Sequence, residues 1–476
     1  MRNVKASALL LGLLSGCSFI PAYHRPALPV TAQYPYAAGG SGTSAAADTG
    51  WRDFFKDPAL QDLIALSIAD NRNLRISVLN VQEAQAQYRV DRASLFPTID
   101  ANGEAIAQHS SAGLSTTGAG VTSHEYSLGA QTVSWELDLF GKIRSEAETA
   151  QQTYLSDADT MLSARISLVA QVAAEYYTWL ADRESLKIAQ DTAAADQHSL
   201  QLTQLEANTG TTTAIAVAQA QTTYDTAMAD VAQFQRQTAQ DMDELVLLAG
   251  APLPVALVQK MDAVSLLANE PPLPLVPAGL PSDLLTRRPD IRAAEHQLLA
   301  ANANIGAARA AFFPSISLTA NGGVASNSLS SLFSGGTTAW LFQPQITLPI
   351  FSGGANLANL DLAKLEKRAQ IANYEGTIQS AFHDVSDALV ARQTYVDQVQ
   401  AEQNLVSADT RYYTLAQMRF NAGVDNYLNV LLAQDSLLSA RLNLVSLQLA
   451  QQQNEITLYK ALGGGWQENG TSTPQG

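Results

Sequence analysis

The sequence predicts a mixed α and β membrane protein in which β-hairpins alternate with long helical hairpins. Three observations carry this prediction: a helical hydrophobic period over residues 354–463, a period of two over residues 314–351, and an earlier copy of both patterns. At 1.5 Å of rise per residue, the longer arm of the helical hairpin would reach ~100 Å. An element of that length cannot form a compact domain, so it must be part of a rod or a tube.

The helical hairpin has a single strong break. No proline falls between Pro349 and Pro474, so nothing forces either arm to kink. The break is residues 420–426, where Gly423 can adopt the left-handed backbone of a helix C-terminus. Asp425 follows at the start of the next helix, and we interpret it as a helix cap rather than a cation ligand.

The chain is a tandem duplication. The run Leu95-Phe96-Pro97 matches Phe312-Phe313-Pro314, and Asn208-Thr209-Gly210 matches Asn421-Ala422-Gly423. We therefore divide the chain into two repeats with a Pro-rich linker between them and a flexible C-terminal tail. The bounds are 57–250 for the first repeat (β-hairpin about 97–139, helical hairpin about 141–250), 251–281 for the linker, 282–463 for the second repeat (β-hairpin about 314–351, helical hairpin about 354–463), and 464–476 for the tail.

The N-terminus predicts a lipoprotein. A positively charged start precedes an apolar run that is too short to span a bilayer, and Leu14-Ser15-Gly16-Cys17 then resembles a bacterial lipobox. Residues 1–16 are interpreted as the signal peptide, and Cys17, the only cysteine, as the lipidated first residue of an extended arm over 17–56. Ser18 stands where an aspartate would retain the protein at the inner membrane, which favours the outer membrane. The alternative is a chance cysteine in an ordinary signal region.

The period-two segments predict four strands of about ten residues, the length of transmembrane barrel strands. Trp135, Trp340 and Phe342 suit an interfacial aromatic belt. Four strands cannot close a barrel, and open edges in lipid would leave backbone groups unpaired. If the strands span the membrane, protomers must share one barrel, and three copies give twelve strands. An antiparallel sheet on a soluble core remains the alternative.

Composition argues against several other functions. The formal charge of −16, without a basic stripe, argues against nucleic acid as a partner. The histidines are scattered without metal-ligand spacing, and no nucleophile elbow, phosphate-binding loop or Cys–His pair occurs. We expect no enzyme, no metal site and no cofactor beyond the covalent lipid on Cys17.

Several long motifs are spread over nearly the whole chain: GWRDFF at 50–55, WELDLFG at 135–141, LTRRPDI at 285–291, AARAAFFPS at 307–315, GVDNYL at 423–428 and LYKALGGGW at 458–466. Together they resemble the TolC-like outer membrane factors of tripartite resistance-nodulation-division efflux systems, in particular the lipoprotein branch typified by OprM. The resemblance implies a homotrimer with a twelve-stranded barrel and a periplasmic α-helical tunnel. It also implies a periplasmic adaptor and an inner-membrane pump as partners. The protein itself would be a passive channel in the outer membrane through which drugs leave the cell.

The resemblance further implies a gate at the second helical tip, made of an apolar ring and an acidic ring. Leu428 falls on the apolar position, Leu432 stands where relatives carry the acid, and Asp435 stands where they carry an arginine. Phe420 and Asn421 replace a tyrosine and an arginine. Our hypothesis is an apolar seal in which Leu428 and Leu432 face the axis. The alternative, that Leu432 packs between helices, stays open.

The two helical tips are the expected docking ends for the adaptor, around Asn208 and Gly210 and around Asn421 and Gly423. A rival function is a lipid-anchored coiled-coil structural or adhesion protein without a pore. A third, an outer-membrane enzyme, lacks any supporting constellation of residues. Oligomeric mass and bilayer conductance distinguish the channel from its main rival.

Overall fold

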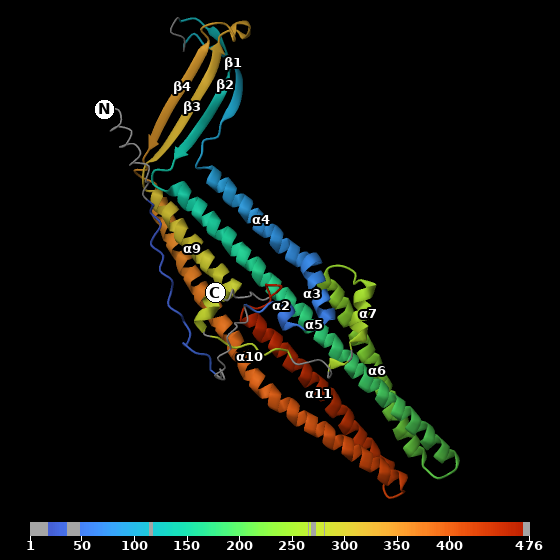
Figure 1. The fold of residues 1–476 in the computed structure, drawn as a ribbon. Coiled ribbons are helices and arrows are strands. Elements are labelled where there is room, and N and C mark those ends of the chain that lie inside the picture. The colour runs from blue at the N-terminus through green and yellow to red at the C-terminus, as the bar shows by residue number, and fades with distance from the viewer. Residues whose placement is uncertain are drawn as a thin grey trace. The chain divides into compact units, whose positions relative to one another are not determined.

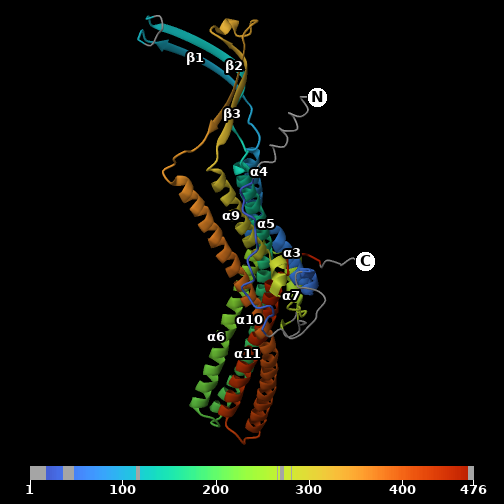
Figure 2. The ribbon, with the colours of Figure 1, turned by 90° about the vertical axis from the view of Figure 1, so that its left-hand side faces the viewer.

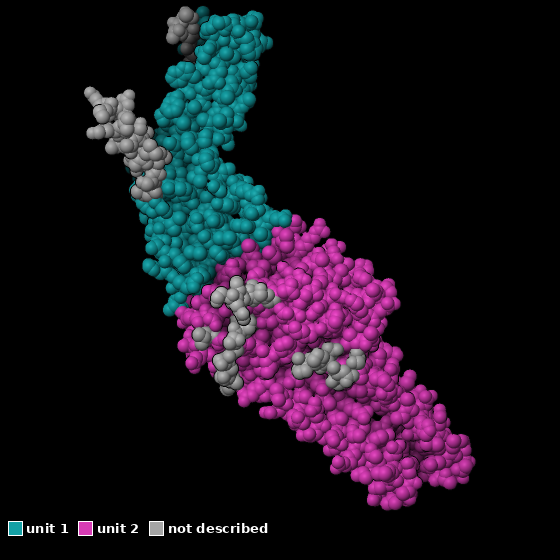
Figure 3. Space-filling model, viewed as in Figure 1, with its two compact units in different colours: residues 1–27, 80–157, 293–374 teal, residues 28–79, 158–292, 375–476 magenta. Residues whose placement is uncertain are grey.

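The computed structural model describes residues 18–35, 48–113, 118–264, 266–267, 273–279 and 281–469. The predicted signal peptide and Cys17 lie outside these residues. The chain divides into two compact units, which Figure 3 colours separately. Unit 1 takes the described residues of 1–27, 80–157 and 293–374, and unit 2 takes those of 28–79, 158–292 and 375–476.

Unit 1 carries a single antiparallel sheet in the order β1-β2-β3-β4 (Figure 1). The strands are β1 (Asp100–Ser110), β2 (Val121–Leu137), β3 (Ser315–Ser326) and β4 (Thr338–Thr347). Strands β2 and β3 pair across the two hairpins, with Leu128 opposite Val324. Both hairpins therefore belong to one sheet, which leaves β1 and β4 as its edges. The short 3-10 helix η4 (Leu329–Ser331) lies between β3 and β4.

The sheet is curved (Figure 2), and β2 and β3 approach each other closely at a pair of glycines. Gly129 pairs with Gly323, and a Cβ on Gly323 would lie 2.2 Å from the carbonyl oxygen of Leu128. A bulge follows on β2 between Thr132 and Trp135, in which Ser134 has a φ of 55°. Close backbone approach and a bulge are the usual means of curving a strand pair, so these residues give the sheet its curvature.

The N-terminal arm packs along α9 (Pro289–Ala310) within unit 1. Asn302 Nδ2 donates to the carbonyl oxygen of Pro21 at 2.8 Å, and the rings of Phe19 and Phe313 stack with centroids 4.5 Å apart. Arg25 forms an ion pair with Glu295 at 2.8 Å. The described start of the predicted extended arm is thus held by backbone, aromatic and charged contacts.

Unit 2 contains two helical hairpins, α5 with α6 (Ala214–Ala249) and α10 with α11 (Tyr427–Ala461) (Figure 1). Helices α5 (Lys142–Asn208) and α10 (Ala355–Asn421) begin in unit 1, and α4 (Arg72–Ala93) begins in unit 2. The shorter elements of unit 2 are α2 (Trp51–Phe54), α3 (Pro58–Asp70), α7 (Val255–Ala263), η3 (Pro281–Asp283) and α8 (Leu284–Arg287). Within the described ranges, none of the helices combines the length and apolar character needed to cross a membrane.

The described residues of the predicted linker pack on the rest of unit 2. It contains α7, whose Leu257 and Met261 are buried, and α7 contacts α3. Lys260 pairs with Asp62 at 2.6 Å. Arg392 of α10 donates to the carbonyl oxygen of Val276 at 2.9 Å. The Pro-rich composition marks the boundary between the repeats, and the buried apolar side chains of α7 pack this segment against the rest of unit 2.

The prediction of a flexible tail over 464–476 is wrong for residues 464–469, and residues 470–476 lie outside the described part. The backbone N–H groups of Trp51 and Arg52 donate to the carbonyl oxygens of Gln467 and Glu468 at 3.0 and 3.1 Å. The Arg52 side chain also pairs with Glu468 at 2.8 Å. The short polar tail is ordered because it supplies acceptors to the otherwise unpaired first N–H groups of α2.

Candidate gate at the helical tips

The tip between α10 and α11 is closed by a Schellman turn. The N–H of Val424 donates to the carbonyl oxygen of Arg419 at 3.0 Å, and that of Gly423 donates to Phe420 at 2.9 Å. Gly423 has a φ of 68°, which a side chain would disfavour. Both bonds satisfy carbonyl groups that the end of a helix leaves free, so the chain reverses tightly at this point.

The interpretation of Asp425 as a helix cap is wrong. The N-cap of α11 is Asn426, which makes no side-chain cap bond. Asp425 instead accepts from Arg419 through both oxygens, at 2.6 and 3.1 Å. The guanidinium offers two parallel N–H donors to the two carboxylate oxygens, and such bidentate pairs combine strength with a fixed geometry. The hydrogen bond from the Arg419 guanidinium holds the pKa of Asp425 below its usual value.

Leu428 and Leu432 lie one turn apart on the same side of α11, and they are 46% and 51% exposed in the protomer. The contact between α10 and α11 uses other residues: Ala416 packs against Val430 and Ala433. The two leucines therefore form an apolar strip that the hairpin itself does not cover. Asp435, also exposed, lies less than one turn beyond Leu432, and partial burial raises its pKa.

The tip between α5 and α6 reverses in the same way. Gly210 has a φ of 76°, and the N–H of Thr211 donates to the carbonyl oxygen of Glu206 at 2.9 Å. Here the hydroxyl groups of Thr209 and Thr211 also donate to Glu206, where the other tip uses an ion pair. Asn208 is the last residue of α5. The structure thus places Asn208 and Gly210, and Asn421 and Gly423, at equivalent points of two similar turns.

Sequence reasoning missed one polar contact between the two hairpins of unit 2. Gln434 Nε2 on α11 donates to Asp196 Oδ1 on α5 at 2.5 Å, and both side chains are buried. In the sequence, Ala433-Gln434 corresponds to Ala220-Gln221 of the first repeat, at the same offset as the two tips, but this match gives no sign of burial. Gln221 makes a different bond, to the exposed side chain of Asp225 on its own helix.

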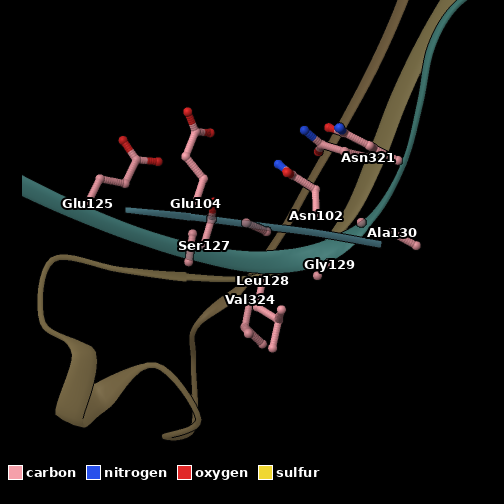
Figure 4. Close-up of a pocket in the computed structure, with 14 residues that line it drawn as sticks. Asn102, Glu104, Glu125, Ser127, Leu128, Gly129, Ala130, Asn321 and Val324 are labelled. Atoms are coloured by element: carbon pink, nitrogen blue, oxygen red, sulfur yellow. The ribbon is translucent and has the colours of Figure 1, made fainter. Parts of the chain in front are cut away.

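The sheet of unit 1 has one polar face. Figure 4 shows Asn102, Glu104 and Glu125 projecting to one side, and Leu128 and Val324 projecting to the other. Such alternation is typical of strands with a wet face and a lipid-facing or packed face. In the part of the chain that the structure describes, no three His, Cys, Asp or Glu side chains gather as metal ligands would.

Comparison with known proteins agrees with this architecture. The family model for outer membrane efflux proteins matches residues 63–251 and 280–464. The toluene efflux pump outer membrane protein TtgC of Pseudomonas putida is 47% identical over 472 residues, 98% of this chain and 96% of that protein. The cation efflux system protein CusC of Escherichia coli is 40% identical over 457 residues, 96% of this chain and 97% of that protein.

A solved structure is similar over the same length. The open state of the MtrE outer membrane channel of Neisseria gonorrhoeae superposes with a TM-score of 0.88 at 38% identity, covering 96% of this chain and 100% of that one. The resemblance drawn from the sequence motifs is confirmed. Relatives of this kind are outer membrane components of efflux pumps and outer membrane channels. The chain belongs to the family of outer membrane efflux proteins, the TolC-like outer membrane factors.

Proposed function

We propose that the protein is the outer-membrane exit channel of a tripartite multidrug efflux pump, working as a homotrimer with a periplasmic adaptor and an inner-membrane pump. The observation that carries the proposal is the open four-stranded sheet, in which β1 and β4 have free edges within the protomer. Backbone groups at a sheet edge have no water to bind inside a bilayer, so both edges must be paired.

Three copies close such a sheet. Because the protomer contributes an even number of antiparallel strands, β1 and β4 run in opposite directions. Joining β4 of one copy to β1 of the next therefore continues the antiparallel pattern, and three copies give twelve strands, within the range of known barrels. The polar face with Asn102, Glu104 and Glu125 would line the pore, and the face with Leu128 and Val324 would meet lipid.

The tandem repeat is supported by the lengths of corresponding helices. Helices α5 and α10 each have 67 residues, and α6 and α11 have 36 and 35. The family model also matches the chain in two stretches of similar length. We propose that residues 57–250 and 282–463 are the two copies, so that a trimer would contain six helical hairpins around one tunnel. The lipid on Cys17 would fasten each copy to the membrane.

The gate would lie at the α10–α11 tips, where three copies bring Leu428 and Leu432 together around the axis. Contact between the exposed leucines of neighbouring copies would remove apolar surface from water, which is favourable, so these leucines would form the seal. Asp435 would flank it with negative charge, and Asp425 would flank it as part of its ion pair with Arg419. The turns at Asn208–Gly210 and Asn421–Gly423 would dock the adaptor, because backbone and polar groups there are accessible.

The cargo is inferred from the relatives. Their names describe toluene efflux and cation efflux, and the identity is higher to the toluene pump protein. We propose small organic compounds, including drugs and solvents, as the main cargo. In such systems the inner-membrane pump would select the cargo, and this chain would conduct it.

Purification from outer membranes in detergent tests the proposal. We expect light scattering to give the mass of three chains, and planar bilayers to show channel conductance. A monomer without conductance would contradict the channel and support the rival, a lipid-anchored coiled-coil structural or adhesion protein.

A further inference from the structure

A buried carboxyl group joins the two helical hairpins of unit 2 above the tips. Asp196 on α5 is 2% exposed, and Gln434 on α11 is 8% exposed. The amide Nε2 of Gln434 donates to Oδ1 of Asp196 at 2.5 Å. The second oxygen, Oδ2, is buried without a hydrogen-bond partner among the described residues. One half of the carboxyl group is therefore satisfied and the other half is not.

Among the described residues, no cation forms an ion pair with Asp196. Its charge interacts with Asp435 and Tyr427 of α11 and with Tyr413 of α10. Arg441 of α11 interacts with Tyr413 and lowers the pKa of its hydroxyl, against the larger effect of burial. Against the same stretch of α5, α6 places apolar side chains, with Ala227 and Val231 packed on Ala189 and Ala193. Burial raises the pKa of Asp196 to about 6, the bond from Gln434 opposes this, and the charge of Asp435 adds to it.

Such a site binds a proton better when the helices are packed than when they are apart. An ionised carboxylate out of water costs free energy unless its oxygens are hydrogen-bonded, whereas the neutral acid costs less. Separation of α11 from α5 would hydrate the Asp196 carboxyl group and return its pKa to the ordinary range of an aspartate. The proton therefore stabilises the packed arrangement selectively.

The contact acts on the same helix that carries the proposed seal. Gln434 lies two residues beyond Leu432 on α11, within one continuous helix. A helix is stiff over so short a distance, so fixing Gln434 against α5 fixes the position of both leucines. This step rests on the proposed function, because it treats Leu428 and Leu432 as the gate.

We propose that a proton on Asp196 locks α11 against α5 and so holds the gate closed, and that loss of this proton weakens the lock. The direction follows from the raised pKa of the packed form. The packing of α11 on α5 is most stable at a pH below the ordinary aspartate pKa. It weakens as the pH rises from there toward about 6, and it changes little at higher pH. An acidic periplasm would thus keep the channel shut.

Conductance of the full-length protein in planar bilayers, with the periplasmic side between pH 5 and pH 7, tests the lock. For wild type we expect the ratio of open to closed channels to rise about tenfold per protomer across this window. Asp196→Asn should stay closed and lose this rise, because the amide is always neutral. The control is Asp191→Asn, which removes an exposed acid paired with Lys187 on the same helix and should titrate like wild type.

Two further measurements cover other outcomes. Gln434→Ala removes the donor that the described residues supply to Asp196, so it should shift the midpoint of the pH dependence upward. Spin labels at Gln201→Cys and Ser436→Cys, both exposed, should move apart as the pH rises, and should not do so with Asp196→Asn. Equal pH dependence of wild type and Asp196→Asn in conducting channels would overturn the lock and leave the channel intact. Loss of conductance in every variant would count against the channel, and the label distances would then decide about the lock.

Discussion

At the scale of single residues, the second tip shows two neighbouring cap formers with different roles. Asp425 and Asn426 are both favoured at helix starts; from the sequence we predict the cap at Asp425, whereas the N-cap of α11 is Asn426. The outcome depends on Arg419 in the last turn of α10, which forms an ion pair with Asp425. Contacts of this kind depend on how the turn folds back, so hydrophobic periodicity cannot reveal them.

Asp196 could not be identified from the sequence for a similar reason. It lies in a run of alanines and polar residues on a long helix, and its partner Gln434 is 238 residues away. Neither residue belongs to a recognisable motif. Only the packing of the two hairpins shows that the carboxyl group is buried.

The proposed seal predicts the effect of shortening either leucine. Fully burying a leucine contributes roughly 2 kcal/mol, and about half of each side chain is already covered in the protomer. Leu428→Ala or Leu432→Ala should therefore remove roughly 1 kcal/mol per protomer and raise the ratio of open to closed channels about fivefold for each. Planar-bilayer conductance measures this ratio. Leu415→Ala, an equally exposed leucine of α10, is the control and should leave the conductance unchanged. If neither variant increases the conductance, the leucines do not seal the channel.

At the scale of elements, the helices were easier to anticipate than the connections between strands. A period of three to four indicates α10 and α11, and Gly423 marks the turn between them. The pairing of β2 with β3 joins segments from two repeats, so no turn sequence between adjacent strands indicates it. The packing of the C-terminal residues 464–469 and of helix α7 also depends on contacts with residues distant in the sequence, which local patterns do not show.

The closest approach in the sheet gives a prediction with an adjacent control. A Cβ on Gly323 would lie 2.2 Å from the Leu128 carbonyl oxygen and would force β2 and β3 apart, whereas a Cβ on Gly322 would have nothing within 4 Å. We expect Gly323→Ala to reduce the amount of assembled protein in the outer membrane severalfold, because the strands cannot pair. Gly322→Ala should assemble normally. Heat-modifiable migration on gels measures assembly, and equal yields would show that the contact can relax.

At the scale of the whole molecule, the excess of acidic residues bears on what the pore conducts. The chain has 44 Asp and Glu against 28 Lys and Arg, and Glu104 and Glu125 lie on the polar face of the sheet. In a trimer this face would bring six carboxylates around one pore. Rings of carboxylates attract cations and repel anions.

Removing these charges should therefore reduce the preference of the channel for cations. We expect Glu104→Gln combined with Glu125→Gln to shift the reversal potential in a salt gradient toward that of a non-selective pore. The pair Asp53→Asn with Asp62→Asn changes the same charge on exposed residues of unit 2 and serves as the control. An identical shift in both pairs would assign selectivity to the net charge instead of the pore wall.

The contact between the two ends of unit 2 has a consequence for the order of synthesis. The ring of Tyr459 stacks on Phe54 with centroids 4.0 Å apart, and its hydroxyl donates to the carbonyl oxygen of Thr49, 410 residues earlier. The backbone hydrogen bonds of Trp51 and Arg52 likewise require Gln467 and Glu468, near the other end of the chain. Contacts between residues so far apart form late. Helix α2, near the N-terminus, is thus among the last elements to be completed, and a chain truncated near its end would expose Trp51 and Phe54 to periplasmic proteases.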